Sequence, residues 1–183
     1  MTLLHKAAFL DRDGVINIDH GYTSVPEQFD FIDGVFAACR YLQQQGYLLI
    51  VVTNQSGIAR GYYTEHQFAL LTCWMKQQFA AHGVKIDGVY YCPHHAEKGQ
   101  SPYNIDCDCR KPHPGMLQQA IREFHIDPAQ SLMVGDKAAD MQAATAAGIA
   151  RKILVRSGQS LTDDDLASAD EVWDSLAQAL HVL

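Results

Sequence analysis

Long apolar runs and an excess of basic residues are both missing from this sequence of 183 residues. The longest apolar run, YLLIVV at 47–52, is far shorter than the roughly 20 residues that span a bilayer. Only four apolar residues separate Lys6 from Asp11, so we expect no signal peptide. With 14 Lys and Arg against 21 Asp and Glu, the formal net charge is −7. These absences argue against a membrane protein and against a general binder of nucleic acid or membrane surfaces.

The sequence also has no internal repeat, low-complexity tract or linker, so we expect one domain over residues 1–183. With no signal peptide expected, we place the chain, as a monomer, in the cytoplasm, where thiols stay reduced. Its five cysteines are therefore interpreted as core residues or metal ligands rather than disulfides. Cys39 and Cys73 each lie on an apolar helical stripe, which favours the core for both.

Short apolar segments alternate with helical patterns along the chain. The apolar segments predict strands at 6–10, 48–54, 85–92, 131–136, 152–156 and 171–173. Apolar residues at helical spacing predict helices over 35–45, from a capping box at Thr64 to a stop at Gly83, after Pro114, and over 137–147. This alternation predicts an α/β fold, a Rossmann-like parallel sheet with helices on both faces. In such sheets the chemistry lies beyond the carboxyl ends of the strands.

Two carboxylates, Asp11 and Asp13, directly follow the first predicted strand. In an extended segment they project to the same side, where they repel each other unless a cation lies between them. Mg²⁺ suits this position because it prefers carboxylate oxygens together with substrate phosphates. The alternative is a polar turn between strand and loop.

The second and fourth predicted strands are followed by polar residues as well. TNQSG at 53–57 offers a hydroxyl, amides and backbone N–H groups that could cradle a phosphoryl oxygen, or it forms an ordinary turn. Asp136 follows the fourth strand and either adds a third carboxylate, with Asp140 four residues on, or caps the next helix. Lys111, before the helix that leads to this strand, would supply positive charge.

Three cysteines lie close together in a polar segment. Cys92, Cys107 and Cys109, with His94 or His95, make a set of three thiols and one imidazole that suits a tetrahedral structural zinc. The spacing does not choose between the two histidines, and the alternative is a set of reduced cysteines in a loop. A zinc would stabilise the irregular loop at 92–109 and so fix Arg110 and Lys111, which follow the last ligand.

The order of these motifs along the chain resembles the haloacid dehalogenase superfamily of phosphohydrolases. FLDRDGVI, VVTN, RKP and VGDKAAD, which run from residue 9 to 140, match its four motifs. The resemblance implies that Asp11 is a nucleophile forming an aspartyl-phosphate and that Asp13 is the general acid and base. It also implies that Thr53 and Lys111 stabilise the phosphoryl group and that Asp11, Asp13 (through its backbone carbonyl) and Asp136 hold Mg²⁺. No insertion is long enough for a large cap domain.

The zinc loop narrows the resemblance to heptose bisphosphate and histidinol-phosphate phosphatases, and TNQSGIARG and FIDGV favour the heptose group. This implies removal of the C7 phosphate from a small sugar bisphosphate, D-glycero-D-manno-heptose 1,7-bisphosphate, on the route to lipopolysaccharide heptose. Arg110 would pair with the phosphate that remains. The implied substrate-binding residues are Asp19, His20, Gly21, Tyr22, Thr53, Asn54, Gln55, Ser56, Arg110, Lys111 and Lys137. The competing hypotheses are a histidinol-phosphate phosphatase, a non-catalytic zinc and phosphate binding module, and a nucleic-acid 3′-phosphatase, against which the acidic charge counts.

Overall fold

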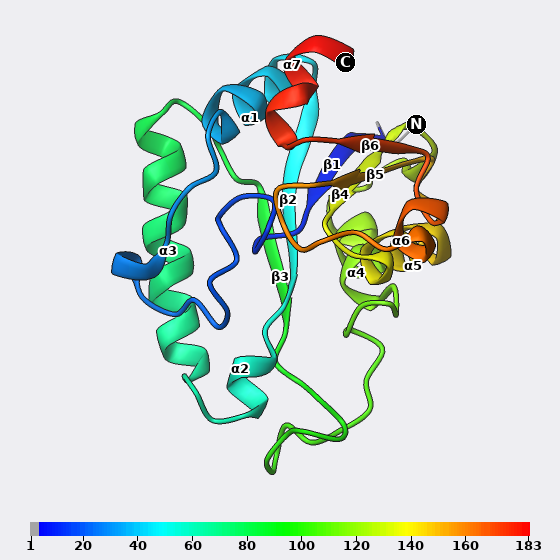
Figure 1. Cartoon of the computed structure of the whole chain (residues 1–183). Helices are drawn as coiled ribbons and strands as arrows, with labels where there is room; N and C mark the ends of the chain where they lie inside the picture. Colours follow the sequence, from blue (N-terminus) through cyan, green and yellow to red (C-terminus); the bar gives the residue numbers. More distant parts are fainter. Residues whose placement is uncertain (1–3) are drawn as a thin grey trace.

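The computed structural model describes residues 4–183 and contains one sheet of six parallel strands in the order β3-β2-β1-β4-β5-β6 (Figure 1). The strands are β1 (Lys6–Leu10), β2 (Tyr47–Asn54), β3 (Gly88–Cys92), β4 (Leu132–Gly135), β5 (Arg151–Val155) and β6 (Glu171–Trp173). In the centre, Leu10 of β1 lies opposite Val51 of β2 and Val134 of β4. The predicted α/β fold with a parallel sheet is confirmed.

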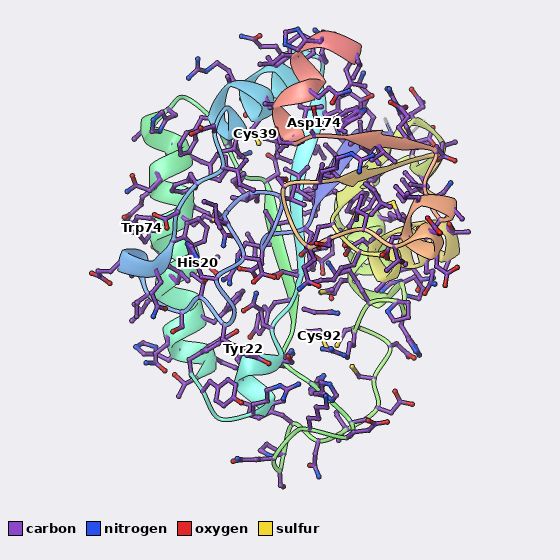
Figure 2. The ribbon with its side chains drawn as sticks, in the orientation of Figure 1. His20, Tyr22, Cys39, Trp74, Cys92 and Asp174 are labelled. Carbon is purple, nitrogen blue, oxygen red and sulfur yellow. The ribbon has the colours of Figure 1, made fainter. Side chains whose placement is uncertain are left out.

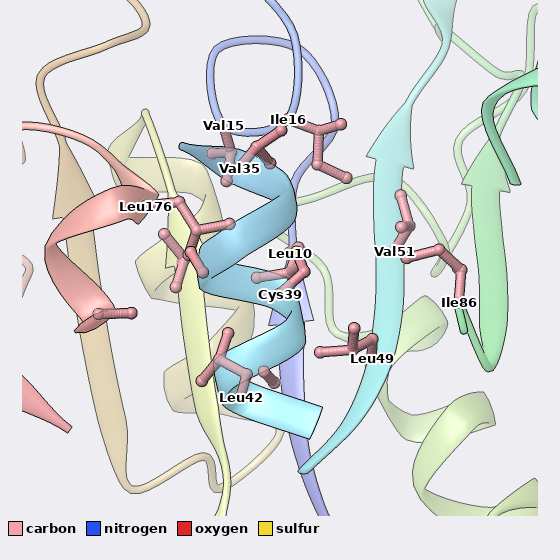
Figure 3. Close-up of a cluster of buried hydrophobic side chains, with 14 of the residues drawn as sticks. Leu10, Val15, Ile16, Val35, Cys39, Leu42, Leu49, Val51, Ile86 and Leu176 are labelled. Carbon is pink, nitrogen blue, oxygen red and sulfur yellow. The ribbon is translucent and has the colours of Figure 1, made fainter. Parts of the chain in front are cut away.

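Successive residues of a strand point to opposite faces of the sheet, and here the residues on both faces are apolar. Helices therefore cover both faces. Ala8 and Leu10 of β1 face the core under α1 (Val35–Gln44), α3 (Glu65–Ala81) and α7 (Ala179–Val182). Figure 3 shows part of this core, with Leu10, Cys39, Leu42 and Leu49 packed between α1 and the sheet. Ala7 and Phe9 face the opposite core, under α4 (Gly115–Glu123) and α5 (Ala138–Ala146).

The shorter helices are α2 (Ser56–Ala59) and α6 (Asp163–Ala167), with 3₁₀ turns η1 (Pro26–Gln28), η2 (Pro128–Gln130) and η3 (Leu176–Gln178). In the described chain, residues 11–34 contain only η1 and residues 55–64 contain only α2. Neither insertion forms a separate layer over the sheet, which agrees with the expected lack of a large cap domain. No helix among the described residues is long and apolar enough to cross a membrane.

Two local expectations differ from the structure. The third strand begins at Gly88 rather than at residue 85, because the Asp87 carboxylate accepts a hydrogen bond from the Leu49 backbone N–H (3.0 Å) and so replaces a ladder contact. Cys39 is buried, but Cys73 is exposed, so its expected core position is wrong. The buried stripe of α3 consists of Phe68, Leu71, Met75 and Phe79, and Cys73 falls two residues from its nearest members, on another side of the helix.

The strand order decides where on the sheet an active site can form. β1 lies between β2 and β4, so the chain leaves the sheet in opposite directions from its centre, and a crevice forms at the carboxyl ends of the strands there. The segments that follow β1, β2 and β4 in the sequence therefore meet at one edge. The long segment after β3 also runs past this edge, beside α2 (Figure 1), and Gln100 N donates to Ala59 O over 2.7 Å.

Candidate active site

A cleft of about 410 Å³ opens at the carboxyl ends of the central strands. It brings together most of the sequence-predicted site: Asp11, Asp13, Asp19, Gly21, Tyr22, Asn54, Gln55, Ser56, Arg110, Lys111 and Lys137. Thr53 and Asp136 are buried and are not part of the lining, but each accepts a hydrogen bond from a lining residue, Gln55 and Gln159 respectively. His20 is not part of the lining, since it is exposed and pairs with Asp30 (2.7 Å). A larger hollow of about 830 Å³ between α3 and β3 has no carboxylate in its lining and lies away from these motifs.

The base of the cleft holds a buried ammonium between two carboxylates. Lys111, only 4% exposed, places its Nζ 3.0 Å from Asp11 Oδ1 and 2.6 Å from Asp140 Oδ1. The same Nζ donates to Val52 O over 2.8 Å. These contacts raise the pKa of Lys111 in spite of its burial, so it stays a cation. Asp11 Oδ1 also accepts from Arg12 N (2.8 Å), whereas no residue in the described part of the chain bonds to Asp11 Oδ2.

Negative charge at the base of the cleft exceeds what Lys111 neutralises. Burial raises the pKa of Asp11 to about 8; Lys111 opposes this rise, while Asp140, Asp136 and Asp13 add to it. Burial also raises the pKa of Asp136 to about 6. A divalent cation between Asp11 and Asp136 would reverse both shifts, because it stabilises ionised carboxylates.

Asp136 has the geometry of an oxygen ligand. It is 1% exposed, and its Oδ1 has no hydrogen-bond partner among the described residues. Gly14 and Gly158 give it room, since a Cβ at either glycine would lie 2.5 or 2.3 Å from Asp136 Oδ2. Carboxylate oxygens of Asp11, Asp136 and Asp140 lie within 4.8 Å of one another. Of these three carboxylates, Asp11 and Asp136 fit a magnesium ion.

Asp140 has a different role from Asp136. Its Oδ2 accepts from the backbone N–H groups of Asp136 and Lys137, each at 3.1 Å, so Asp140 and not Asp136 caps the start of α5. Because its Oδ1 bonds to Lys111, both of its oxygens are engaged within the protein. This leaves Asp11 and Asp136 as the carboxylates free for the metal.

Asp13 is held by hydrogen bonds on both carboxylate oxygens. Oδ1 accepts from Arg12 Nη2 and Asn17 Nδ2, each at 3.0 Å. Oδ2 accepts from Arg12 Nε and Gln55 Nε2, each at 3.2 Å. Burial favours the neutral acid, but the Arg12 guanidinium and these donors outweigh it and lower the pKa of Asp13.

Asn54 ties the end of β2 to the segment that carries Lys111. Its Nδ2 donates to Lys111 O (3.1 Å), and Lys111 N donates to its Oδ1 (3.0 Å). This reciprocal pair fixes the backbone of Lys111. Arg110, one residue earlier, donates to His94 O (3.3 Å) and lines the cleft.

The mouth of the cleft is formed by the segment after β1. Tyr22, a non-glycine residue with a positive φ of 56°, packs edge-on against Tyr62 with ring centroids 4.7 Å apart. Arg60 lies over the Tyr22 ring at 5.7 Å. Lys137 Nζ approaches Asp19 Oδ2 at 3.9 Å. In Figure 2 Tyr22 lies in the lower part of the molecule, toward the loop that contains the cysteines.

The predicted zinc ligands form a compact cluster (Cys92 is labelled in Figure 2). The three sulfurs lie 3.1–3.5 Å apart, which is too far for a disulfide. His94 Nδ1 lies 3.4 Å from Cys109 Sγ and 3.8 Å from Cys92 Sγ. Tetrahedral zinc with bonds of about 2.0–2.3 Å holds ligand atoms roughly 3.5–3.8 Å apart. The two distances from His94 Nδ1 are close to this spacing, and the sulfurs would move apart by only a few tenths of an ångström to hold zinc, so this donor set fits. His95 Nδ1 instead accepts from Lys98 N (3.2 Å), so the geometry favours His94 as the fourth ligand.

The cleft lining also contains residues that the sequence-based set of site residues lacks, and those with polar side chains are Tyr63, Asp140 and Gln159. Gln159 N donates to Asp136 Oδ2 and Gln159 Nε2 to Asp19 Oδ2, each at 3.4 Å. Gln159 follows β5, so the rule that chemistry lies beyond strand ends could have found it. The spacing of Asp140 from Asp136 was visible in the sequence, whereas Tyr63 gives no local signal.

Comparison with known proteins gives concordant results at three levels. A family model described as HAD-hydrolase-like matches residues 108–179. The D-glycero-beta-D-manno-heptose-1,7-bisphosphate 7-phosphatase of Vibrio cholerae serotype O1 is 56% identical over 177 residues, which are 97% of this chain and 95% of that protein. The enzyme of the same name from Escherichia coli K12 is 55% identical over 171 residues, which are 93% of this chain and 90% of that one.

A solved structure extends the likeness to three dimensions. The D,D-heptose 1,7-bisphosphate phosphatase of B. bronchiseptica, complexed with magnesium and phosphate, is 32% identical and superimposes with a TM-score of 0.80. The match covers 94% of this chain and 94% of that chain. The fold is therefore shared with this structure, and the match extends over more than nine tenths of both chains.

Proposed function

The chain belongs to the family of D-glycero-beta-D-manno-heptose-1,7-bisphosphate 7-phosphatases, and on that premise we propose that it removes the C7 phosphate of this sugar bisphosphate. It is a HAD-type phosphatase, a hydrolase of phosphoric monoesters. The observation that carries the proposal is 56% identity over 97% of the chain, extending over 95% of the relative. The names of these relatives favour the β anomer, and the reaction would supply heptose for lipopolysaccharide.

Asp11 is the proposed nucleophile. Its Oδ1 is held by Lys111 and Arg12, which leaves Oδ2 free at the surface of the cleft. Oδ2 attacks phosphorus, the bond from phosphorus to the C7 oxygen breaks, and an aspartyl-phosphate forms on Asp11. Water then attacks this phosphorus, releases inorganic phosphate and restores the carboxylate.

Asp13 is the proposed general acid and base. It gives a proton to the departing C7 oxygen and takes one from the attacking water. Arg12 and the neighbouring amides hold its pKa below the usual value, so Asp13 is ionised and able to accept a proton in the second step. The approach of an anionic phosphate raises the pKa of a nearby carboxylate, so bound substrate favours the protonated form that the first step needs.

The charge of the phosphoryl group requires cations. Phosphoryl transfer depends mainly on in-line positioning and on neutralising the equatorial oxygens. Lys111, through its charge, and the Thr53 hydroxyl, through a hydrogen bond, would stabilise these oxygens from the base of the cleft. Magnesium, when bound by Asp11, Asp136 and the Asp13 backbone carbonyl, would offset the remaining negative charge.

Arg110 at the cleft wall would hold the phosphate that is not transferred, since its planar guanidinium matches phosphate geometry. Asp19, Gly21, Tyr22, Ser56 and Lys137 would contact the sugar. His20, which pairs with Asp30 outside the cleft, has no geometric support for such a role.

The zinc cluster would be structural rather than catalytic. All four of its donors come from the protein, as in closed structural sites, and none of the four lines the cleft. A site with three thiolates needs a reducing environment, which supports the cytoplasm as the compartment. The expectation of a monomer stays a prediction, to be checked by sedimentation.

A substrate panel tests the proposal. The magnesium-loaded enzyme should release phosphate fastest from the β anomer of the heptose 1,7-bisphosphate, more slowly from the α anomer, and far more slowly from histidinol phosphate, fructose 1,6-bisphosphate or a 3′-phosphorylated oligonucleotide. A higher kcat/KM for histidinol phosphate would reject the heptose assignment. No turnover of any compound would favour a binding module.

A further inference from the structure

A buried relay of hydrogen bonds runs from Tyr63 through Gln55 to the base of the cleft. Tyr63 Oη lies 2.5 Å from Gln55 Oε1. Gln55 Nε2 donates to Thr53 Oγ1 over 2.8 Å and to Asp13 Oδ2 over 3.2 Å. Gln55 and Tyr63 are 1% and 5% exposed. The amide group of Gln55 therefore makes its contacts inside the protein.

The position of the Gln55 amide fixes the direction of the bonds in this relay. Gln55 Nε2 lies within hydrogen-bond distance of both Asp13 Oδ2 and Thr53 Oγ1, so its NH₂ group donates to these two residues. The amide oxygen then faces Tyr63, whose hydroxyl must donate. Burial raises the pKa of Tyr63 to about 12, with Arg12 opposing and Asp13 adding to the shift, so the hydroxyl keeps its proton at neutral pH.

The relay also decides what the Thr53 hydroxyl can do. Because Thr53 Oγ1 accepts from Gln55, its own O–H remains free to donate. A phosphoryl oxygen accepts hydrogen bonds, so Thr53 can serve it only as a donor. If the Gln55 amide were reversed, the Thr53 hydroxyl would donate its hydrogen bond to the amide oxygen and could not donate to a phosphoryl oxygen.

We propose that Tyr63 is a positioning residue, which acts through Gln55 to keep Thr53 a hydrogen-bond donor and to orient the Asp13 carboxylate. The inference rests on the proposed function, in which Thr53 and Asp13 serve the transferred phosphoryl group. Tyr63 needs no contact with the sugar for this effect, because its hydroxyl is already bonded to Gln55.

The ring of Tyr63 is fixed independently of its hydroxyl. A Cβ at Gly57 would lie 2.2 Å from the ring, so only glycine allows α2 to pack this closely. Ile58 and Phe68 form a small core with Tyr63, and Thr64, the next residue, caps α3. Removing the hydroxyl alone should therefore leave the ring in place.

Tyr63→Phe tests the relay with two substrates, the heptose 1,7-bisphosphate and p-nitrophenyl phosphate. One neutral hydrogen bond is lost, so kcat should fall about three- to tenfold on both. KM should stay within about twofold, because the loss concerns the reaction step. Tyr90→Phe is the matched control, since it removes a tyrosine bond to Glu123 outside the cleft and should leave both rates unchanged.

A double-mutant cycle separates positioning from simple packing. Gln55→Leu should lower kcat about ten- to a hundredfold, since the amide contacts to both Thr53 and Asp13 are lost. In the Gln55→Leu protein, Tyr63→Phe should have no further effect on kcat, because the amide through which the Tyr63 hydroxyl acts is already absent. If the reductions in kcat caused by the two single substitutions multiply in the double variant, the two residues act independently and the proposal is overturned.

Two results with Tyr63→Phe alone would also overturn it: unchanged kcat on both substrates, or a loss confined to the heptose compound, which would indicate contact with the sugar. Failure of the proposed function looks different. In that case the wild type would hydrolyse p-nitrophenyl phosphate but not the heptose compound, and the cycle could still be measured on the aryl phosphate.

Discussion

The ionised form of Asp11 is destabilised, because this carboxylate is buried and lies beside Asp13, Asp136 and Asp140. We expect Asp11→Asn to lower turnover by at least about a thousandfold, since an amide is a poor nucleophile. The fold should persist, with the metal-free melting temperature unchanged or higher, because one buried like charge is removed. Phosphate release and thermal melting measure the two effects. Asp164→Asn, an exposed change on α6, is the control, and near-normal turnover in an Asp11→Asn sample verified by mass spectrometry would reject the nucleophile.

Arg110 and Lys111 are neighbours in sequence with different expected roles. Loss of one charge-assisted contact to phosphate costs about 1.5–3 kcal/mol, or roughly ten- to a hundredfold. Arg110→Ala should lower kcat/KM for the 1,7-bisphosphate by this factor and barely affect a monophosphate. Steady-state kinetics with both substrates decide the point, and equal losses would assign Arg110 to the transferred phosphate.

Among the elements, we expect the loop at 92–109, with zinc bound, to support the segment that carries these two cations. Cys107→Ala should reduce bound zinc well below one per chain and speed hydrogen exchange over residues 93–106, because the turns of this loop lack helix or strand hydrogen bonding. Elemental analysis and hydrogen exchange by mass spectrometry measure both. Cys73→Ala, at an exposed thiol, should change neither. Unaltered exchange in a zinc-free Cys107→Ala protein would refute the supporting role.

The strands were predictable to within about three residues because their signals are local: apolar runs bounded by polar residues. The short helices α2, α6 and α7 were not predicted, since four or five residues show no usable periodicity. The strand-end rule placed Asp11, Thr53 and Asp136 at one edge of the sheet.

What the sequence could not reveal are contacts between segments distant along the chain. The pairing of Lys111 with Asp140 and the relay from Tyr63 depend on tertiary packing. The choice of His94 over His95 likewise depends on how the loop folds back on Cys92. Spacing alone fixes none of these contacts.

For the whole molecule, the balance of charge in the cleft links stability to pH and magnesium. The folded-state pKa values of Asp11 and Asp136, about 8 and about 6, lie above the usual value of about 3.9. A carboxyl with a raised pKa contributes stability at low pH, and this contribution is lost as pH rises through the folded pKa. The metal-free protein, with zinc kept loaded, should therefore melt at a lower temperature at pH 8 than at pH 6.

Magnesium should reverse this trend because it replaces the protons. At about 100 times its dissociation constant a ligand contributes roughly 2.7 kcal/mol, or about 5–10 °C for a chain of this size. Thermal melting with and without magnesium should show a larger gain at pH 8 than at pH 6, and Asp11→Asn should flatten the difference. A gain that is larger at pH 6 would contradict the assigned metal site.

The position of bond cleavage decides whether this chain is a 7-phosphatase. We would follow the magnesium-loaded enzyme acting on the β anomer of the heptose 1,7-bisphosphate by ³¹P NMR. We expect the C7 phosphate signal to disappear as inorganic phosphate forms, while the C1 phosphate signal persists as heptose 1-phosphate. Loss of the C1 phosphate, or no release while histidinol phosphate is hydrolysed by the same sample, would contradict it.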